Sequence, residues 1–356
     1  MDKPIVSIVA NFYNSAKFIP KLMESIQKQT FTAWQLVAVN DCSPGRDLEI
    51  LERYAATDPR IVIVDNKVNQ GICQAKWIGI AHAEGQYITF IDGDDWLEPR
   101  ALEVMVQAAM AKDLDMVVIN NYRDFRFFRR ECRSSADYGR VIERDEWFDR
   151  YFVNFFGLFR YGVTYWAKLY RTDMVRNCGF KIPETVIKED LYFSTHIFQH
   201  VNRMMFVDYA GYHWRFGGLS SVGSNPVWGR RASIERNHQF FDTRLELIAK
   251  YDYQKALKWL LIELRNHLLE CFYDEARYDF DDRRAADSVA FLRRMMAFHG
   301  YADIMSYPDY KAGNHAQLDR LLVSGDVRGV YDYCRRYRRQ NMMRDRAKKI
   351  LKFLIR

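Results

Sequence analysis

The chain has 356 residues, of which 49% are hydrophobic and 28% are charged. It is too long for one small core and too apolar for a disordered chain, so we expect one large domain with an extension, or two domains. No apolar run reaches the roughly 18 residues of a membrane-spanning helix, and Met1–Pro4 shows no secretory signal pattern. The six cysteines form no C-x-x-C pair. Neither a zinc site nor a disulfide framework is therefore indicated, and a reducing cytosol is expected.

Strands and helices alternate through the first third of the sequence. Short apolar runs predict strands at 5–10, 35–39, 61–64, 87–91 and 116–119. Segments with helical spacing of apolar residues predict helices at 15–29, 48–56, 72–83 and 99–111. Repeated strand–helix units predict an α/β fold with a Rossmann-like, mostly parallel sheet flanked by helices. Residues beyond Trp228 read as a helical C-terminal extension.

Polar clusters follow four of the predicted strands. They lie at Asn11–Asn14, Asn40–Ser43, Asp65–Asn66 and Asp92–Asp95. Ligands bind at the carboxyl ends of the strands in parallel sheets, so we expect these clusters to meet at one site.

The segment Asp92-Gly93-Asp94-Asp95 places three carboxylates directly after an apolar strand. These charges repel one another unless a cation compensates them, and a divalent ion with oxygen ligands would also bind substrate phosphates. A polar loop in which Asp94 or Asp95 caps a helix is the alternative, and local sequence alone leaves both open.

Five ordered motifs between Val6 and Pro99 resemble the donor half of family 2 glycosyltransferases, which have the GT-A fold. They are Val6-Ser7-Ile8-Val9 followed by Tyr13-Asn14, Ser25 to Phe31, Val39-Asn40-Asp41-Cys42-Ser43, Asn69-Gln70-Gly71 followed by Ala75-Lys76, and Gly85 to Pro99. Together these motifs cover about a quarter of the chain in the order and spacing typical of the family.

The resemblance implies a role for each matching position. Tyr13 would pack on the nucleotide base, Asp41 would accept a hydrogen bond from it, and Asn69 and Lys76 would line the nucleotide pocket. Asp92 would lie near the ribose or the metal. Asp94 would ligate Mn²⁺ or Mg²⁺ on the diphosphate.

Two residues depart from the family pattern. Asn40 replaces a common Asp, and Lys76 replaces a common Arg. Lysine lacks the planar fork of arginine, so a preference for a UDP-sugar is less secure.

A second motif, Glu189-Asp190, follows the family-like segment Trp166–Arg171. The resemblance implies that Asp190 is the general base of an inverting transfer, with Glu189 at the donor. A carboxylate in that role removes the proton of the acceptor hydroxyl as the new bond forms. The alternative is a solvated helix start.

A third motif, from Tyr212 to Ser221, resembles a loop that closes the donor site in related enzymes. Arg215 and Ser220 would hold the departing diphosphate. His213 would complete the metal shell through a neutral ring nitrogen. The alternative for His213 is a packed side chain whose hydrogen bonds are already made.

The positive charge is concentrated at the end of the chain. Residues Tyr331–Arg356 carry a net charge of +8, whereas the other 330 residues carry −1. Apolar residues recur at helical spacing here, at Met343, Ala347, Ile350, Leu351 and Leu354. This basic amphipathic pattern predicts peripheral binding to an anionic membrane. A solvated terminal helix is the main alternative, and no nucleic-acid-binding fold is evident.

These patterns divide the chain into a catalytic domain at 1–222, a helical region at 223–330 and the tail at 331–356. The donor half would be 1–121 and the acceptor half 122–222. The predicted function is metal-dependent transfer from a nucleotide-sugar to a glycan or lipid-linked glycan, at the cytoplasmic face of the membrane, in bacterial surface-polysaccharide synthesis. A non-catalytic nucleotide-sugar-binding scaffold tethered to the membrane is the alternative, and a nucleotidyltransferase is a second enzymatic one.

Overall fold

The computed structural model describes residues 3–125, 127–134, 136–152, 164–179, 189–215, 316–337 and 340. The chain divides into two compact units, Met1–Phe155 with Phe159–Val227, and Phe156–Leu158 with Trp228–Arg356. Within the described ranges, no helix combines the length and the hydropathy that crossing a bilayer requires.

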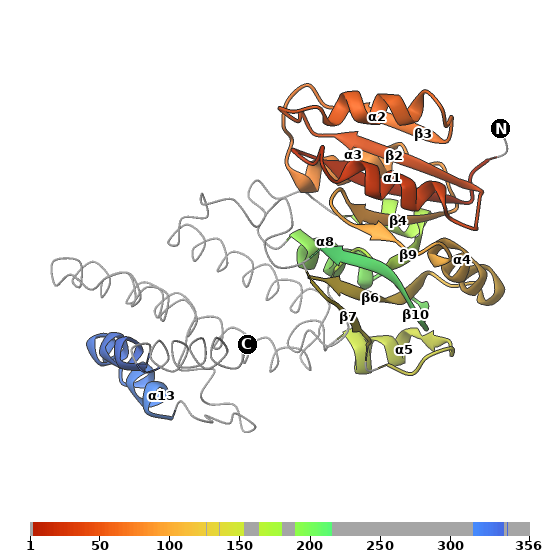
Figure 1. Cartoon of the computed structure of the whole chain (residues 1–356). Helices are drawn as coiled ribbons and strands as arrows, with labels where there is room; N and C mark the ends of the chain where they lie inside the picture. The colour runs from red at the N-terminus through yellow and green to blue at the C-terminus, as the bar shows by residue number, and fades with distance from the viewer. Residues whose placement is uncertain are drawn as a thin grey trace. The chain divides into compact units, whose positions relative to one another are not determined.

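The first unit is built on one ten-stranded sheet (Figure 1). Its strands are β1 Val6–Phe12, β2 Trp34–Asn40, β3 Ile61–Asp65, β4 Tyr87–Asp92, β5 Trp96–Leu97, β6 Met116–Asp124, β7 Arg129–Cys132, β8 Ile142–Glu143, β9 Lys168–Arg171 and β10 Arg203–Arg215. The order is β3-β2-β1-β4-β9-β6-β10-β5, with β7 paired to β6 and β8 to β10. The predicted α/β architecture is confirmed.

The sheet is parallel only in part. Strands β3, β2, β1 and β4 are parallel to one another, as the strand–helix alternation predicts. Strand β9 then runs antiparallel to both β4 and β6, whereas β10 runs parallel to β6. The full sheet is therefore mixed, and β9 lies between β4 and β6 as the strand at which the direction changes.

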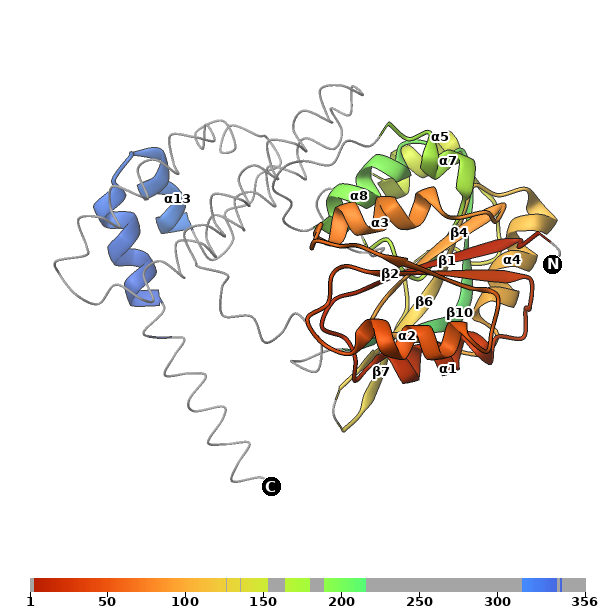
Figure 2. The same cartoon turned by 90° about the horizontal axis from the view of Figure 1, so that it is seen from above.

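Helices cover both faces of the sheet. They are α1 Ile19–Gln27, α2 Asp47–Ala55, α3 Ile72–Ala81, α4 Ala101–Lys112, α5 Arg144–Glu146, the π-helix η1 Trp147–Phe152, α7 Thr172–Arg176 and α8 Glu189–Phe198. Figure 2 shows α1 and α2 on one face and α3 with α8 on the other. All seven residues of β2 are buried, as expected for a strand covered on both sides. Gly79 lets α3 approach β1, because a Cβ there would lie 2.4 Å from Val9 Cγ1.

The first helix begins later than the sequence predicts. The spacing predicts a helix from Ser15, but α1 starts at Ile19 with Pro20 in its first turn. Proline is tolerated there because its missing N–H would have no partner within the helix. The preceding residues, including the left-handed Asn14, turn the chain from the end of β1 into the helix.

Helices also form the described part of the second unit. Helix α13 spans Ala316–Val323, and helical backbone resumes at 327–337 after Gly325, whose φ is 70°. This second helix runs through Tyr331, where the tail was predicted to start. Tyr331 and Cys334 are buried, and burial raises the pKa of the Cys334 thiol to about 12. The predicted apolar stripe from Met343 onward lies outside the described residues.

Candidate functional site

The loop after β2 is organised by one buried carboxylate. The oxygens of Asp41 accept hydrogen bonds from the amides of Gln70 and Gly71, both at 2.9 Å, and from Nδ2 of Asn66 at 2.8 Å. Asn69 Nδ2 donates to the Asp41 carbonyl at 3.1 Å. The structure thus brings together Asp41 and Asn69, the two predicted nucleotide-binding residues of these loops. Asp41 holds the loop that carries Asn69.

Tyr13 lies on the neighbouring loop, after β1, and its side chain is exposed. Two contacts fix this loop against the one after β2. The amide of Asn14 donates to Ser43 Oγ at 3.3 Å, and the amide of Ser15 donates to the buried carboxylate of Asp47 at 2.6 Å. Tyr13 therefore presents an accessible ring beside the Asp41 loop, where a flat base could stack.

Lys76 and Asp92 are joined by a residue that sequence reasoning missed, Tyr165. Lys76 is 3% exposed, and its Nζ has no hydrogen-bond partner among the residues that the structure describes. The ammonium lies 3.6 Å from the centroid of the Tyr165 ring, which is cation–π geometry. The Tyr165 hydroxyl donates to Oδ1 of Asp92. Tyr165 thus contacts two predicted site residues at once.

The acidic loop lies tight against the end of β1. A Cβ at Gly93 would lie 2.6 Å from the carbonyl oxygen of Asn11, so only glycine fits without a shift of the backbone. The amide of Asp95 donates to the Asp92 carbonyl at 3.0 Å and closes the turn. This packing holds the three carboxylates at the tip of β4, between β1 and the later strands.

Asp95 is the most enclosed carboxylate of the loop. The Tyr212 hydroxyl donates to its Oδ2 at 2.7 Å, and the amide of Arg215 donates to its Oδ1 at 2.8 Å. Burial raises the pKa of Asp95 well above its usual range, and the charges of Asp92 and Asp94 raise it further. Burial also raises the pKa of Tyr212, which keeps its hydroxyl protonated as the donor to Asp95.

Arg215 comes from β10 and closes over the same loop. Its Nε donates to the Asp94 carbonyl at 2.8 Å. Its guanidinium lies 4.7 Å from the Phe18 ring centroid and 4.8 Å from that of Trp96. The predicted phosphate-binding arginine is therefore held beside the acidic loop. Ser220, predicted to act with it, lies outside the described residues.

His213 of β10 lies between two carboxylates. Its Nδ1 lies 2.8 Å from Oδ2 of Asp124, and its Nε2 lies 2.8 Å from Oε1 of Glu98. The ring is 1% exposed and stacks between Trp96 and Tyr122. Both ring nitrogens already lie within hydrogen-bond distance of a carboxylate oxygen. This arrangement matches the packed alternative for His213, in which its hydrogen bonds are already made.

The predicted base, Asp190, lies in the first turn of α8. The side chains of Glu189 and Asp190 are outside the described part of the chain. Phe193, further along α8, is buried and packs edge-on against Phe90 of β4 and Trp77 of α3. These contacts place the body of α8 next to the strand that carries the acidic loop.

A divalent cation fits the chemistry of this loop, although the ligand set is small. Asp92 and Asp94 supply the hard carboxylate oxygens that Mn²⁺ and Mg²⁺ prefer. The described residues contain no group of three or more His, Cys, Asp and Glu side chains arranged to hold a metal ion. The remaining ligands would have to come from a bound diphosphate or from water, as is usual for Mg²⁺.

Comparison with known proteins agrees with this fold. Residues 7–179 match the family model described as Glycosyl transferase family 2. The Bacillus subtilis protein named Uncharacterized glycosyltransferase EpsJ is 29% identical over 213 residues, which are 60% of this chain and 61% of EpsJ. Putative glycosyltransferase EpsH of the same species is 31% identical over 225 residues, 62% of this chain and 63% of EpsH.

A solved structure shares the fold. The crystal structure of S. aureus TarS 1-349 in complex with UDP-GlcNAc superposes with a TM-score of 0.62 at 16% identity, over 94% of this chain and 92% of TarS 1-349. The fold is that of the GT-A glycosyltransferases. In sequence, the chain is similar to proteins of glycosyl transferase family 2. It spans about three fifths of the length of the two Bacillus relatives.

Proposed function

We propose that this protein transfers a sugar from a nucleotide-diphosphate donor, a UDP-sugar in the first instance, to a hydroxyl of a glycan or lipid-linked glycan. One observation carries the proposal. Two cationic side chains, Lys76 from α3 and Arg215 from β10, approach the acidic loop from separate parts of the fold, and each is tied to it. A site with both charges in place suits a diphosphate that is bridged to carboxylates by a metal ion.

The donor would lie across the carboxyl ends of β1, β2 and β4. The exposed ring of Tyr13 would stack on the base, and the loop held by Asp41 would present Asn69 to its edge. Lys76 and Arg215 would face the phosphates.

Asp94, with Asp92, would hold Mn²⁺ or Mg²⁺. The ion supplies positive charge to the diphosphate oxygens as the sugar leaves.

Asp190 would take the proton of the acceptor hydroxyl, with Glu189 beside it. Attack opposite the leaving diphosphate would invert the anomeric centre. The proposal is supported by the position of α8, which Phe193 packs against β4 and α3. The general base Asp190 would then approach the anomeric carbon from α8, on one face of the sheet, and the diphosphate would lie at the strand ends.

The setting we propose is the inner face of the cytoplasmic membrane, in the assembly of a bacterial surface polysaccharide. The basic sequence of Tyr331–Arg356 supports contact with an anionic membrane, particularly beyond residue 340. A lipid-linked glycan is the acceptor class that best accounts for such a contact.

Donor hydrolysis tests the proposal, because water replaces the unknown acceptor. The purified chain should release UDP from a UDP-sugar in the presence of Mn²⁺. Asp94→Asn should lose both the hydrolysis and the metal dependence of UDP affinity, whereas Asp190→Asn should bind UDP normally and hydrolyse the donor slowly. Asp173→Asn, at an exposed position on α7, is the matched control. Pyrophosphate release would indicate a nucleotidyltransferase, and UDP binding without turnover in any variant would indicate a scaffold.

A further inference from the structure

The turn between β6 and β7 forms a narrow hairpin with phenylalanine at its tip. Asp124 pairs with Arg129 at the last register position, and the amide of Phe125 donates to the Phe128 carbonyl at 2.9 Å. The side chain of Phe127 is 86% exposed and that of Phe128 is 63% exposed. Figure 2 shows the hairpin projecting beyond the rest of the first unit. Large apolar groups therefore stand at a convex point, where the core does not bury them.

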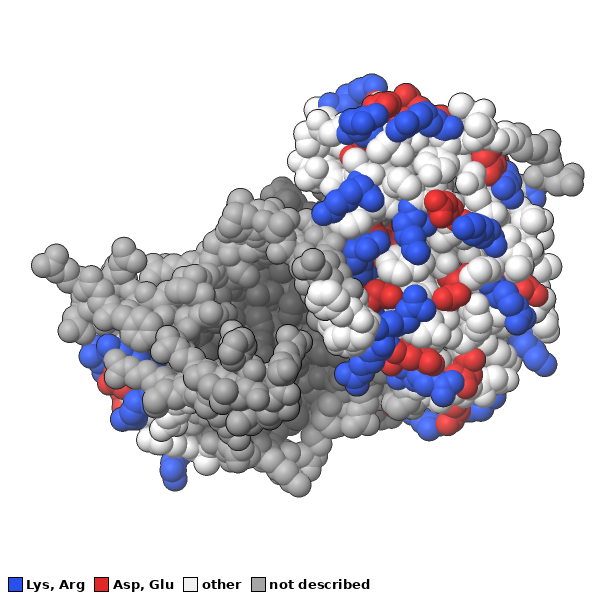
Figure 3. Space-filling model, in the orientation of Figure 1, with Lys and Arg blue, Asp and Glu red and all other residues white. Residues whose placement is uncertain are grey.

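The hairpin is also basic. Residues 122–133 contain five arginines and two carboxylates, a net charge of +3. Arg129 pairs with Asp124 at 3.0 Å and Arg133 with Asp208. Arg130 is exposed and forms no ion pair with any residue that the structure describes. Elsewhere on the face seen in Figure 3, basic and acidic side chains are interspersed. An electrostatic contact with an anionic surface would therefore be local to the hairpin.

We propose that this hairpin tip inserts into the headgroup region of an anionic phospholipid bilayer. A convex pair of phenyl rings cannot enclose a ligand, and phenylalanine has no polar group with which to hydrogen-bond a glycan. The same rings can enter the boundary between headgroups and acyl chains while the neighbouring arginines stay with the phosphates. Phenylalanine beside arginine is the composition of interfacial membrane contacts.

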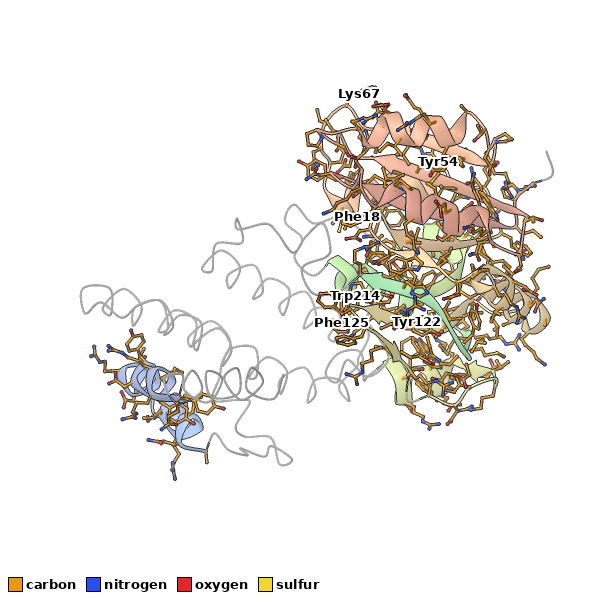
Figure 4. The ribbon with its side chains drawn as sticks, in the orientation of Figure 1. Phe18, Tyr54, Lys67, Tyr122, Phe125 and Trp214 are labelled. Carbon is orange, nitrogen blue, oxygen red and sulfur yellow. The ribbon has the colours of Figure 1, made fainter. Side chains whose placement is uncertain are left out.

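The tip lies beside the candidate site. Asp124, at the base of the tip, contacts His213, and in the parallel register of β6 and β10 it pairs with Arg215. Arg215 in turn holds the acidic loop. Figure 4 shows Phe18, Trp214 and Phe125 along one edge of the unit. A bilayer bound at the tip would face this edge, which suits a lipid-linked acceptor. That consequence rests on the proposed function, whereas membrane binding by the tip does not.

Vesicle cosedimentation of the full chain tests the inference. Phe127→Ser/Phe128→Ser should weaken binding to phosphatidylglycerol-containing vesicles at least tenfold. Arg130→Glu should weaken binding to these vesicles and leave binding to neutral phosphatidylcholine vesicles unchanged. Met110→Ser is the matched control, because Met110 on α4 is 53% exposed and away from the hairpin. All variants should melt like the wild type, since the altered side chains are on the surface.

Two results would overturn the inference. The first is unchanged vesicle binding by the double variant, whether because the wild type does not bind or because another segment carries the contact. The second is a double variant that still binds vesicles but has a lower mass in solution than the wild type, which would mean that the tip joins two copies of the chain. Calorimetric UDP binding on the same samples keeps the two proposals apart. Equal vesicle binding by the wild type and the double variant, with UDP bound by both, defeats only the inference. Weaker vesicle binding by the double variant, with no UDP binding by the wild type, defeats only the proposed function.

Discussion

Replacement of Lys76 by methionine should stabilise the fold while it impairs donor binding. The ammonium of Lys76 is buried and has no hydrogen-bond partner among the described residues. Burying a charge costs several kcal/mol even after relaxation, and a desolvated cation–π contact such as that with Tyr165 returns about 2 kcal/mol. Methionine fills a similar volume without the charge, so Lys76→Met should gain about 1 to 3 kcal/mol of stability.

Lys168 supplies the matched control for this substitution. It is 2% exposed, as deeply buried as Lys76, but its Nζ donates to the carbonyl of Thr164 at 2.6 Å and to that of Trp166 at 3.3 Å. Lys168→Met would remove both hydrogen bonds from the charged amine, and bonds of this kind contribute about 1.5 to 3 kcal/mol each. The two substitutions are chemically identical, yet we expect opposite shifts in stability.

Thermal unfolding and calorimetric titration with UDP measure the two effects together. Lys76→Met should raise the Tm by about 2 to 4 °C for each kcal/mol gained in a domain of this size. It should also weaken UDP binding by about 10- to 100-fold, because a charge-assisted contact contributes about 1.5 to 3 kcal/mol. A lower Tm would refute the view that Lys76 is an unsatisfied cation, and unchanged UDP affinity would remove it from the donor site.

Three further predictions concern single contacts. Tyr165→Phe keeps the ring under the Lys76 ammonium but removes the hydroxyl that hydrogen-bonds to Asp92. The rate of nucleotide-sugar hydrolysis should therefore fall about tenfold, with a Tm change of no more than a few degrees. His213→Gln should lower the Tm and leave the Mn²⁺ affinity in the presence of UDP unchanged; a loss of that affinity would support His213 as a ligand. Hydrogen bonding from Arg60 lowers the pKa of Asp58. Asp58→Asn should therefore cost about 1 kcal/mol at neutral pH, and less as the pH falls through the lowered pKa, as measured by urea unfolding.

Much of the donor side of the fold can be read from sequence, because local patterns determine it. Strands β1 to β4 and the helices between them follow from apolar periodicity, and their parallel order follows from the alternation. The direction of β9, in contrast, cannot be read from the sequence. Its four residues give a strand signal without orientation, and tertiary contacts such as the hydrogen bond from Thr89 Oγ1 to the Lys168 carbonyl at 2.7 Å accompany its antiparallel pairing.

The candidate site, too, is determined partly by local sequence patterns and partly by contacts between distant residues. Asp41 and Asn69 meet because each lies on a loop at the carboxyl edge of the sheet, which the pattern of strands predicts. Tyr165 could not be found this way, since its hydroxyl contacts a residue 73 positions away and no motif marks it. For His213, sequence leaves a metal ligand and a packed side chain both open, because it cannot say which carboxylates face the ring. Its two partners, 89 and 115 residues away, give it a structural role.

The acidic loop belongs to the donor half in sequence but depends on the rest of the unit for its geometry. Two of its carboxylates accept hydrogen bonds from tyrosines that come later in the chain. Asp92 accepts from Tyr165, in the segment before β9, and Asp95 accepts from Tyr212 of β10. The backbone of Arg215 adds a second donor to Asp95. The three aspartates of the loop have the same chemistry and therefore acquire different surroundings only when β9 and β10 join the sheet. Donor binding and the later strands are coupled by these contacts, so a donor half folded alone would have the motif without its orientation.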